Sequence, residues 1–387
     1  MKIPTIFYDV TEISQLNRKT GIQRATWEIY QALSDLASLS AWEIVPVIGD
    51  ASSGHFHRAD IDARIETFVA AADKIVITPS PSDVFLGVDL HYKIARSLIS
   101  RLDHFRTSGC SIFFIVYDIL PITHPALFAG NDKWFANEDF LAQFIYWLSS
   151  AAAVSNALIA ISLTTRRQVE TWLETQSIAK KPHLAHFRLG TNPPRYFDTP
   201  PTARIADVFG SSQSFLMVGT LEPRKGHLLA LEAFNLLWAQ GEEARLVIIG
   251  KPGWRSENLM HCIGCHPRLG TDLFYVDSAT DDELAYSYAS ASTLLSLSEA
   301  EGFGLPNIEA ASYGLPIVAR DIDVFREACG EGAYYVPADL DAAILAQHLQ
   351  SWKALVAQGN SPSSSHVRLN SWRDSALELL NAMSIAF

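Results

Sequence analysis

Short apolar segments alternate with segments of helical periodicity along the first half of the chain. Ile3–Asp9 and Trp42–Ile48 have the length and the β-branched and aromatic content of buried strands, and Gly21–Leu36 between them has the periodicity of a helix. This alternation is typical of a parallel sheet with helices on both faces. The same pattern predicts further strands at 74–77, 84–86, 112–117 and 157–161 and a helix at 166–175.

The pattern is interrupted at Thr191–Pro201 (TNPPRYFDTPP), where closely spaced prolines cannot continue a helix or a central strand. Beyond it the alternation restarts with a strand at 214–218, a helix at 227–240, strands at 244–249, 273–276, 291–297 and 316–319, and helices at 281–290 and 306–313. We therefore predict an α/β fold with two Rossmann-like, doubly wound domains at 1–197 and 198–370. A last helix within 371–387 is expected to pack back on the N-terminal domain.

Composition and charge narrow the functional class. A chain of 387 residues with 48% hydrophobic residues has enough apolar material for two folded domains. The net charge of −12 argues against a protein that coats nucleic acid or an anionic membrane. The longest apolar run, Ser111–Leu120, is half the ~20 residues that span a bilayer, and no signal-peptide pattern follows Met1. We expect a cytoplasmic protein without a nucleic-acid partner, with at most peripheral association at the inner face of the membrane.

The four cysteines predict reduced thiols. Cys110 and Cys329 are isolated, whereas Cys262 and Cys265 lie in the segment HCIGCH. A structural zinc site usually takes a second pair of ligands from another segment, and the sequence has no second pair at a suitable spacing. We therefore predict neither a metal nor another cofactor.

The segment Ser298–Ala310 (SEAEGFGLPNIEA) joins a strand end, a glycine-containing loop and the start of a helix. Ligands of open parallel sheets bind at such strand ends. Gly302 and Gly304 allow close approach of the backbone, and Pro306 suits the first helical position, where its missing N–H costs nothing. The amides of this loop and the positive end of the helix dipole favour an anion, and a diphosphate is the natural anion for this fold.

Two carboxylates flank this loop. Glu301 lies just before it, and Glu309 falls about one turn into the helix, where it can accept both hydrogen bonds of a ribose diol. Taken singly, Glu309 is better explained as a complement to the helix dipole and Glu301 as a surface charge. The combined pattern of Glu, Gly-Phe-Gly, Leu-Pro and Glu favours a ligand site.

A second strand end carries positive charge. In Val218–His227 (VGTLEPRKGH), Gly219 follows the strand, and Arg224 and Lys225 precede a helix. Two fixed cations at this place can neutralise a diphosphate leaving group, and such electrostatic stabilisation is usually the largest catalytic contribution. Considered by itself, this segment is better explained as a solvated Arg-Lys pair.

The second half resembles the retaining glycosyltransferases of family 4, glycosyl transferases group 1. The resemblance rests on these two segments, on IIGKPGW at 248–254, on the helix start at 281–284 and on the chain up to Ile322. The resemblance implies a GT-B fold, in which two domains face a cleft, and metal-independent transfer with retention of anomeric configuration. It also implies that Glu301 contacts the donor sugar, that Glu309 holds the ribose, and that Arg224 and Lys225 bind the diphosphate. We assign catalytic roles to Glu301, Arg224 and Lys225. The donor-binding residues predicted in this half are Gly219, Arg224, Lys225, Glu301, Gly302, Phe303, Gly304, Leu305 and Glu309.

The first half resembles the family less strongly. Asp9–Arg24 is similar to the loop that opens the acceptor domain, which implies that Gly21 lies near the donor diphosphate. VYDILPITHP at 116–125 is similar to the strand end where many relatives carry a His-Asp pair that faces the donor sugar, and here Tyr117 replaces the histidine. Asp118 is then the catalytic candidate of this half, with a capping residue as the alternative. Tyr117 and His124 are candidates for acceptor binding.

Three functions follow from these observations. The leading hypothesis is transfer of a hexosyl or deoxyhexosyl group from GDP-mannose, a UDP-hexose or dTDP-rhamnose to a saccharide or lipid-linked saccharide in surface polysaccharide synthesis. The YDILP variant resembles members that use mannose and rhamnose donors, and glucose and galactose donors stay open. A nucleotide-sugar-binding protein without turnover is the non-enzymatic alternative, with Tyr117 in its favour. A nicotinamide-dependent oxidoreductase is least favoured, because neither half has the Gly-x-Gly-x-x-Gly turn after its first strand.

Overall fold

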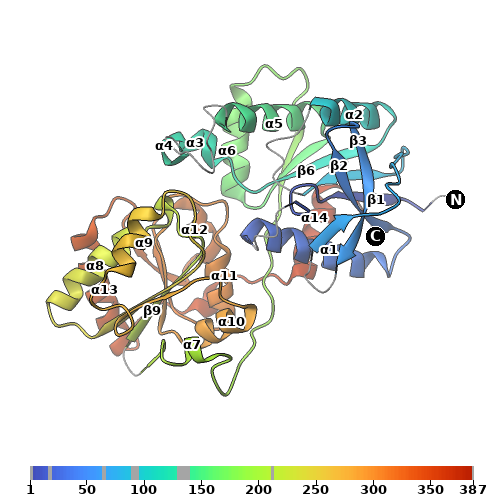
Figure 1. Cartoon of the computed structure of the whole chain (residues 1–387). Coiled ribbons are helices and arrows are strands. Elements are labelled where there is room, and N and C mark those ends of the chain that lie inside the picture. Colours follow the sequence, from blue (N-terminus) through green and yellow to red (C-terminus); the bar gives the residue numbers. More distant parts are fainter. Residues whose placement is uncertain are drawn as a thin grey trace. The chain divides into compact units, whose positions relative to one another are not determined.

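The chain divides into two compact units, each built around its own mainly parallel sheet (Figure 1). The structure is a computed structural model, and it describes residues 3–15, 20–62, 67–88, 96–128, 140–210 and 213–385. Unit 1 comprises residues 1–125, 137–190 and 370–387, and unit 2 comprises residues 126–136 and 191–369. The predicted α/β class with two Rossmann-like sheets is confirmed.

Unit 1 contains an eight-stranded sheet in the order β4-β3-β2-β1-β5-β6-β7-β8. The strands are β1 (Thr5–Asp9), β2 (Glu43–Asp50), β3 (His55–Asp62), β4 (Thr67–Ala70), β5 (Val84–Gly87), β6 (Ser111–Val116), β7 (Ala157–Ala160) and β8 (His183–His186). The helices are α1 (Gly21–Ala37), α2 (Arg96–Thr107), α3 (Leu120–Thr123), α5 (Phe140–Val154), α6 (Leu163–Glu174) and α14 (Trp372–Ala382), and α4 (Pro125–Phe128) begins at the end of this unit's first segment. Helices α2 and α5 pack together, and α1 packs against the C-terminal α14 (Figure 1).

One edge of this sheet differs from the sequence-based prediction. Strands β3 and β4 pair in antiparallel fashion, whereas the prediction had parallel strands only. The predicted strand at 74–77 is not a strand, because Lys74 has a φ of 46° and Val76 makes only an isolated bridge to His57. Strand β3 was not predicted because most residues of its sequence, HFHRADID, are polar. Its Phe56 is nevertheless fully buried in the core.

Unit 2 contains a six-stranded parallel sheet in the order β11-β10-β9-β12-β13-β14, which is the doubly wound order of Rossmann domains. The strands are β9 (Gln213–Val218), β10 (Ala244–Ile249), β11 (Leu273–Val276), β12 (Thr293–Ser296), β13 (Ile317–Arg320) and β14 (Ala333–Val336). The helices are α7 (Ala203–Ala206), α8 (His227–Ala239), α9 (Glu257–Gly264), α10 (Asp281–Ser290), α11 (Leu305–Ser312), α12 (Asp323–Cys329) and α13 (Ala342–Ala357), with short 3-10 helices η1 (Pro223–Lys225) and η2 (Ser364–His366).

The strand order of unit 2 reverses between β9 and β12. Helices α8 and α13 lie on one side of the sheet, and α10 and α11 lie on the other (Figure 1). The register pairs only Thr293 with Phe215 and Leu294 with Leu216, so the two strands are joined near the start of β12. In doubly wound sheets, ligands bind at the carboxyl ends of the strands on either side of this reversal.

Candidate functional site

The loops that follow β9 and β12 lie side by side at the reversal point. Gly226, with a φ of 74°, ends the β9 loop, and a Cβ added to it would lie 2.8 Å from the carbonyl oxygen of Leu297. The backbone N–H of Glu299 donates to the carbonyl oxygen of Arg224 at 2.8 Å. The glycine therefore allows the close approach of the two backbones that carry the candidate residues.

Glu301, from the β12 loop, is held by two cations from the β9 loop. Its Oε2 lies 3.0 Å from Arg224 Nη1, and its Oε1 is ion-paired with Lys225 Nζ. Oε1 also accepts a hydrogen bond from Ser298 Oγ at 2.8 Å. The structure thus brings together the three residues of unit 2 for which the sequence predicted catalytic roles.

Arg224 is fixed on its other sides as well. Its Nη1 donates to the carbonyl oxygen of Ala300 at 2.9 Å, and its Nε lies 2.9 Å from Glu222 Oε2. Glu222 Oε2 has no hydrogen-bond partner in the part of the chain that the structure describes. Its contact with Arg224 is therefore an ion pair without hydrogen-bond geometry. Glu222 was not among the predicted site residues, although its place two positions before Arg224 was visible in the sequence.

The charge state of Glu301 follows from its surroundings. Burial raises the pKa of Glu301, but the nearby charges of Lys225 and Arg224 outweigh burial and lower that pKa to about 2. Only 12% of the Glu301 side chain is exposed, so solvent screens these pairs less than it screens surface salt bridges. Glu301 is therefore an anion at neutral pH, and both cations have fixed positions in the structure.

The glycine loop ends at α11. Gly304 is the N-cap of this helix with a φ of 92°, and a Cβ added to it would lie 2.7 Å from Cε1 of Phe325. No side chain of the described residues caps the helix. The helix begins at Leu305, so Pro306 lies at its second position, whereas the sequence had predicted the first. The first turn of α11 therefore presents a positive helix end that suits an anion.

The ribose candidate Glu309 lies inside unit 2. It is on α11 and 8% exposed, and its Oε2 accepts a hydrogen bond from the Tyr288 hydroxyl at 2.7 Å. Asn307, two residues earlier, is fully buried, and neither atom of its amide has a partner among the residues that the structure describes. The sequence signalled neither Tyr288 nor Asn307, because nothing local distinguishes them from other helical residues.

His227, the first residue of α8, is another buried group near the cluster. It is 2% exposed, and its Nδ1 lacks a hydrogen-bond partner within the described ranges. Burial, and then the charge of Lys225, lower the pKa of His227 to about 3. This histidine is therefore neutral at physiological pH and adds no charge to the two cations.

Four of the predicted residues belong to unit 1. Gly21 is the first residue of α1. Tyr117 is 4% exposed, and its hydroxyl lies 3.2 Å from Thr26 Oγ1 on α1. Asp118 Oδ1 accepts the backbone N–H of Leu120 at 3.0 Å, which forms an Asx-turn before α3, whose N-cap is Ile119. His124 Nδ1 lies 2.8 Å from Thr123 Oγ1.

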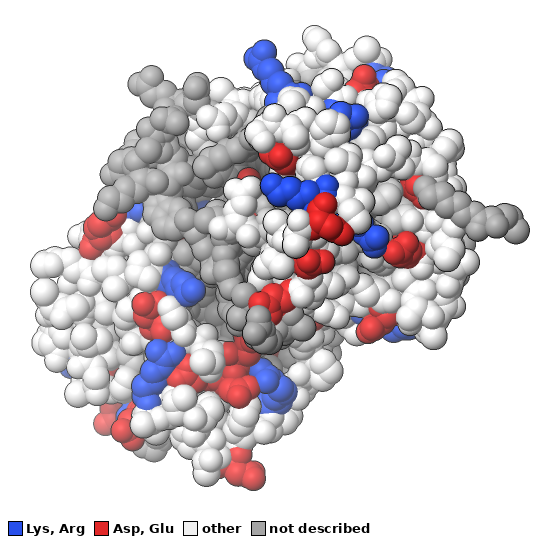
Figure 2. All heavy atoms as spheres, turned by 45° about the vertical axis from the view of Figure 1, so that its right-hand side comes forward, with Lys and Arg blue, Asp and Glu red and all other residues white. Residues whose placement is uncertain are grey.

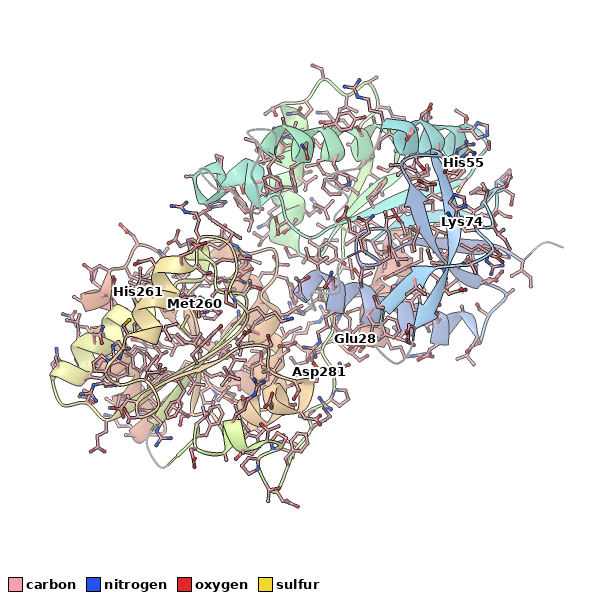
Figure 3. All side chains as sticks on the ribbon, viewed as in Figure 1. Glu28, His55, Lys74, Met260, His261 and Asp281 are labelled. Carbon is pink, nitrogen blue, oxygen red and sulfur yellow. The ribbon has the colours of Figure 1, made fainter. Side chains whose placement is uncertain are left out.

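The described ranges contain no cluster of three or more His, Cys, Asp or Glu side chains that could hold a metal ion. His261, labelled on α9 in Figure 3, has its Nδ1 3.9 Å from Cys265 Sγ.

Acidic and basic side chains are intermixed on the face shown in Figure 2. Among the described residues, no helix combines the length and the apolar character needed to cross a membrane.

A family model covers most of unit 2. The segment 204–357 matches "Glycosyl transferases group 1". Residues 204–357 are a glycosyl transferases group 1 domain. This confirms the resemblance seen in the sequence and places Arg224, Lys225, Glu301 and Glu309 inside the domain.

Curated relatives extend the similarity to the first half. The serotype-specific mannosyltransferase WbdA of Escherichia coli is 32% identical over 391 residues, which is 98% of this chain and 45% of that protein. The O-antigen chain mannosyltransferase B of Escherichia coli is 33% identical over 177 residues, 44% of this chain and 45% of that protein. In each case the matched residues span less than half the length of the relative.

Solved structures show the fold. A sucrose-phosphate synthase from Thermosynechococcus elongatus has a TM-score of 0.66 at 16% identity, with 98% of both chains covered. The Anabaena protein HepE, solved in complex with UDP and glucose, has a TM-score of 0.62 at 12% identity, with 99% of this chain and 100% of that chain covered. Both have the GT-B fold, and the chain described here shares it.

Proposed function

We propose that this chain transfers a mannosyl group from GDP-mannose to a saccharide or lipid-linked saccharide acceptor in the synthesis of a surface polysaccharide. The observation that carries the proposal is the cluster of Arg224, Lys225 and Glu301 at the strand reversal of a glycosyl transferases group 1 domain. The similarity to two mannosyltransferases supports mannose as the sugar. A UDP-hexose and dTDP-rhamnose are the other donors that this site could take.

The donor is proposed to bind along the loops after β9 and β12. Its diphosphate lies at the N-terminus of α11 against Arg224 and Lys225, because these groups supply positive charge at fixed positions. Glu309 accepts hydrogen bonds from the two ribose hydroxyls. Glu301, ionised at neutral pH, accepts hydrogen bonds from hydroxyls of the sugar.

The proposed transfer retains the anomeric configuration. The bond between the anomeric carbon and the diphosphate oxygen breaks, and its electron pair stays on the leaving diphosphate. Arg224, Lys225 and the amides of α11 stabilise that charge, so the step needs no metal ion. The acceptor hydroxyl oxygen bonds to the anomeric carbon from the same face, and its proton passes to the departing phosphate oxygen. In unit 1, Asp118 and His124 are proposed to orient the acceptor.

Nucleotide binding is the first test. GDP, UDP and dTDP are titrated calorimetrically in EDTA into the wild type, Glu309→Ala and, as a control for an exposed carboxylate of the same unit, Glu331→Ala. We expect micromolar binding of GDP that weakens at least tenfold in Glu309→Ala only. Preference for UDP or dTDP would reassign the sugar, and binding of none of the three by folded protein would remove the proposal.

Turnover is the second test. The wild type is incubated with GDP-mannose and short α-mannosides, and GDP release and the anomeric configuration of the product are measured by NMR. The proposal expects an α-linked product from the α-linked donor. Tight GDP binding without transfer or hydrolysis would favour the nucleotide-sugar-binding alternative, and a β-linked product would overturn retention.

A further inference from the structure

A buried tyrosine hydroxyl contacts the candidate ribose carboxylate. Tyr288 lies on α10 and Glu309 on α11, and the Tyr288 hydroxyl donates to Glu309 Oε2 at 2.7 Å. The tyrosine is 3% exposed and the glutamate 8%. A hydrogen bond from a neutral donor to a carboxylate in such a shielded place is stronger than one in water.

The Tyr288 ring is itself held in place. It stacks on the ring of Tyr313, with 5.7 Å between ring centroids and an interplanar angle of 26°. The Tyr313 hydroxyl in turn accepts the backbone N–H of Arg195 at 3.1 Å. Thr280 and Glu283 form a capping box at the start of α10, which fixes the helix that carries Tyr288. The tyrosine hydroxyl therefore reaches Glu309 from a fixed direction.

This contact controls the orientation of the carboxylate. The last torsion of a glutamate side chain is broad and roughly two-fold, so a carboxylate without a fixed donor samples many planes. A carboxylate has about four acceptor positions on its two oxygens, which is enough for the tyrosine hydroxyl and two ribose hydroxyls together. A hydrogen bond that sets the plane in advance lowers the ordering cost of binding a diol.

We propose that Tyr288 is a positioning residue that fixes the Glu309 carboxylate for the ribose diol of a nucleoside diphosphate. This inference rests on the proposed function, because it takes Glu309 as the ribose-binding carboxylate. Tyr288 acts through Glu309 and does not itself contact the nucleotide. Loss of its hydroxyl weakens binding only for ligands that have the ribose diol.

The experiment compares GDP with 2′,3′-dideoxy-GDP by calorimetric titration. Tyr288→Phe removes only the hydroxyl and keeps the ring stacked on Tyr313. Tyr313→Phe is the matched control, because it removes a hydroxyl from the same stack that is bonded to a backbone N–H and not to Glu309. Glu309→Ala and the double variant with Tyr288→Phe complete the set, and thermal melting reports the folding of each.

In Tyr288→Phe we expect GDP to bind about 5- to 10-fold more weakly, dideoxy-GDP to bind as it does to the wild type, and Tyr313→Phe to change neither. The double variant should bind GDP no more weakly than Glu309→Ala alone. With the full substrate, the donor KM should rise by a similar factor at unchanged kcat.

The outcomes separate the two proposals. If the wild type and Glu309→Ala bind both ligands alike, the ribose role of Glu309 fails, and with it the proposed donor site. If Glu309→Ala loses the preference for GDP while Tyr288→Phe keeps it in full, only the role of Tyr288 is overturned. Equal weakening of both ligands by Tyr288→Phe would show a purely structural role and would also overturn it.

Discussion

Lys225 and Glu301 stand 76 positions apart in the sequence and form an ion pair at the strand reversal of unit 2. Each comes from the loop that follows one of the two strands at this point, β9 for Lys225 and β12 for Glu301. The pair gives unit 2 an ionised carboxylate with a pKa of about 2 beside fixed positive charge. A site of this kind is preorganised, because its charges need no rearrangement when negative charge develops nearby.

Glu301→Gln tests the carboxylate of this pair. The neutral amide cannot pair with Arg224 and Lys225, so the cations lose a fixed partner and the sugar loses a charged acceptor. We expect kcat for GDP release from GDP-mannose to fall about 10²- to 10³-fold in a folded protein. Glu299→Gln is the control, because Glu299 is 47% exposed and lies 3.6 Å from Arg320 Nη1 in a looser pair. Near-normal turnover by Glu301→Gln would remove its catalytic role.

Glu222→Gln tests the second carboxylate beside Arg224. Since Glu222 Oε2 lies 2.9 Å from Arg224 Nε, its charge helps to hold the guanidinium in place. We expect the KM for GDP-mannose to rise about 3- to 10-fold, with a smaller change in kcat, because the diphosphate contact is made before and during transfer. Glu232→Gln, an exposed change on α8, should leave both constants as they are. A fall in kcat alone would contradict this assignment.

Gly304→Ala tests the loop in front of α11. Both Gly304 (φ 92°) and Gly314 (φ 70°) have backbone conformations that disfavour other residues. Only Gly304 also lacks space, since its added Cβ would meet Phe325 at 2.7 Å, whereas nothing lies within 4 Å at Gly314. We expect Gly304→Ala to weaken GDP binding at least tenfold and to lower the melting temperature more than Gly314→Ala, which should bind GDP normally. Equal effects of the two changes would indicate that backbone conformation alone matters.

Glu283→Gln tests a buried charge that lies outside the loops after β9 and β12. Arg204 donates to Glu283 Oε1 at 2.7 Å and to Oε2 at 2.6 Å, and these bonds, against the opposing effect of burial, lower the pKa of Glu283 to about 2. A carboxylate whose pKa is lower in the folded state stabilises the fold above its unfolded pKa near 4.5, and this contribution is lost as the pH falls towards about 2. The amide oxygen of glutamine can keep the capping box with Thr280, so the change removes the charge and the hydrogen bonds to the other oxygen.

The expected result is a lower urea midpoint for Glu283→Gln than for the wild type at pH 7, with the difference shrinking between pH 4.5 and pH 3. Asp282→Asn is the control, because the Asp282 pair with Arg195 is about half exposed on both sides and such surface pairs contribute little. A difference between Glu283→Gln and the wild type that stays constant down to pH 3 would show that the ion pair does not carry the pH dependence.

Much of the fold and part of the site could be predicted because they depend on local pattern. Alternating apolar strands and amphipathic helices determined the α/β class, since burying one face imposes a period on the residues of each element. The step from β12 through Gly304 to Pro306 is also local, so the helix start that is proposed to bind the diphosphate could be placed from the sequence. The hairpin strand β3 escaped prediction because only Phe56 and Ala59 of its eight residues are buried.

Only the tertiary structure decided which distant residues meet. Strand order in a sheet depends on how all strands pack together, so no local pattern could state that the loops after β9 and β12 are neighbours. The same holds for Tyr288, whose hydroxyl reaches Glu309 because α10 and α11 pack on one side of the sheet. The sequence by itself determined the kinds of chemical groups and the elements that carry them, because both are encoded within short segments. Their pairing was decided by the packing of segments that lie far apart in the chain.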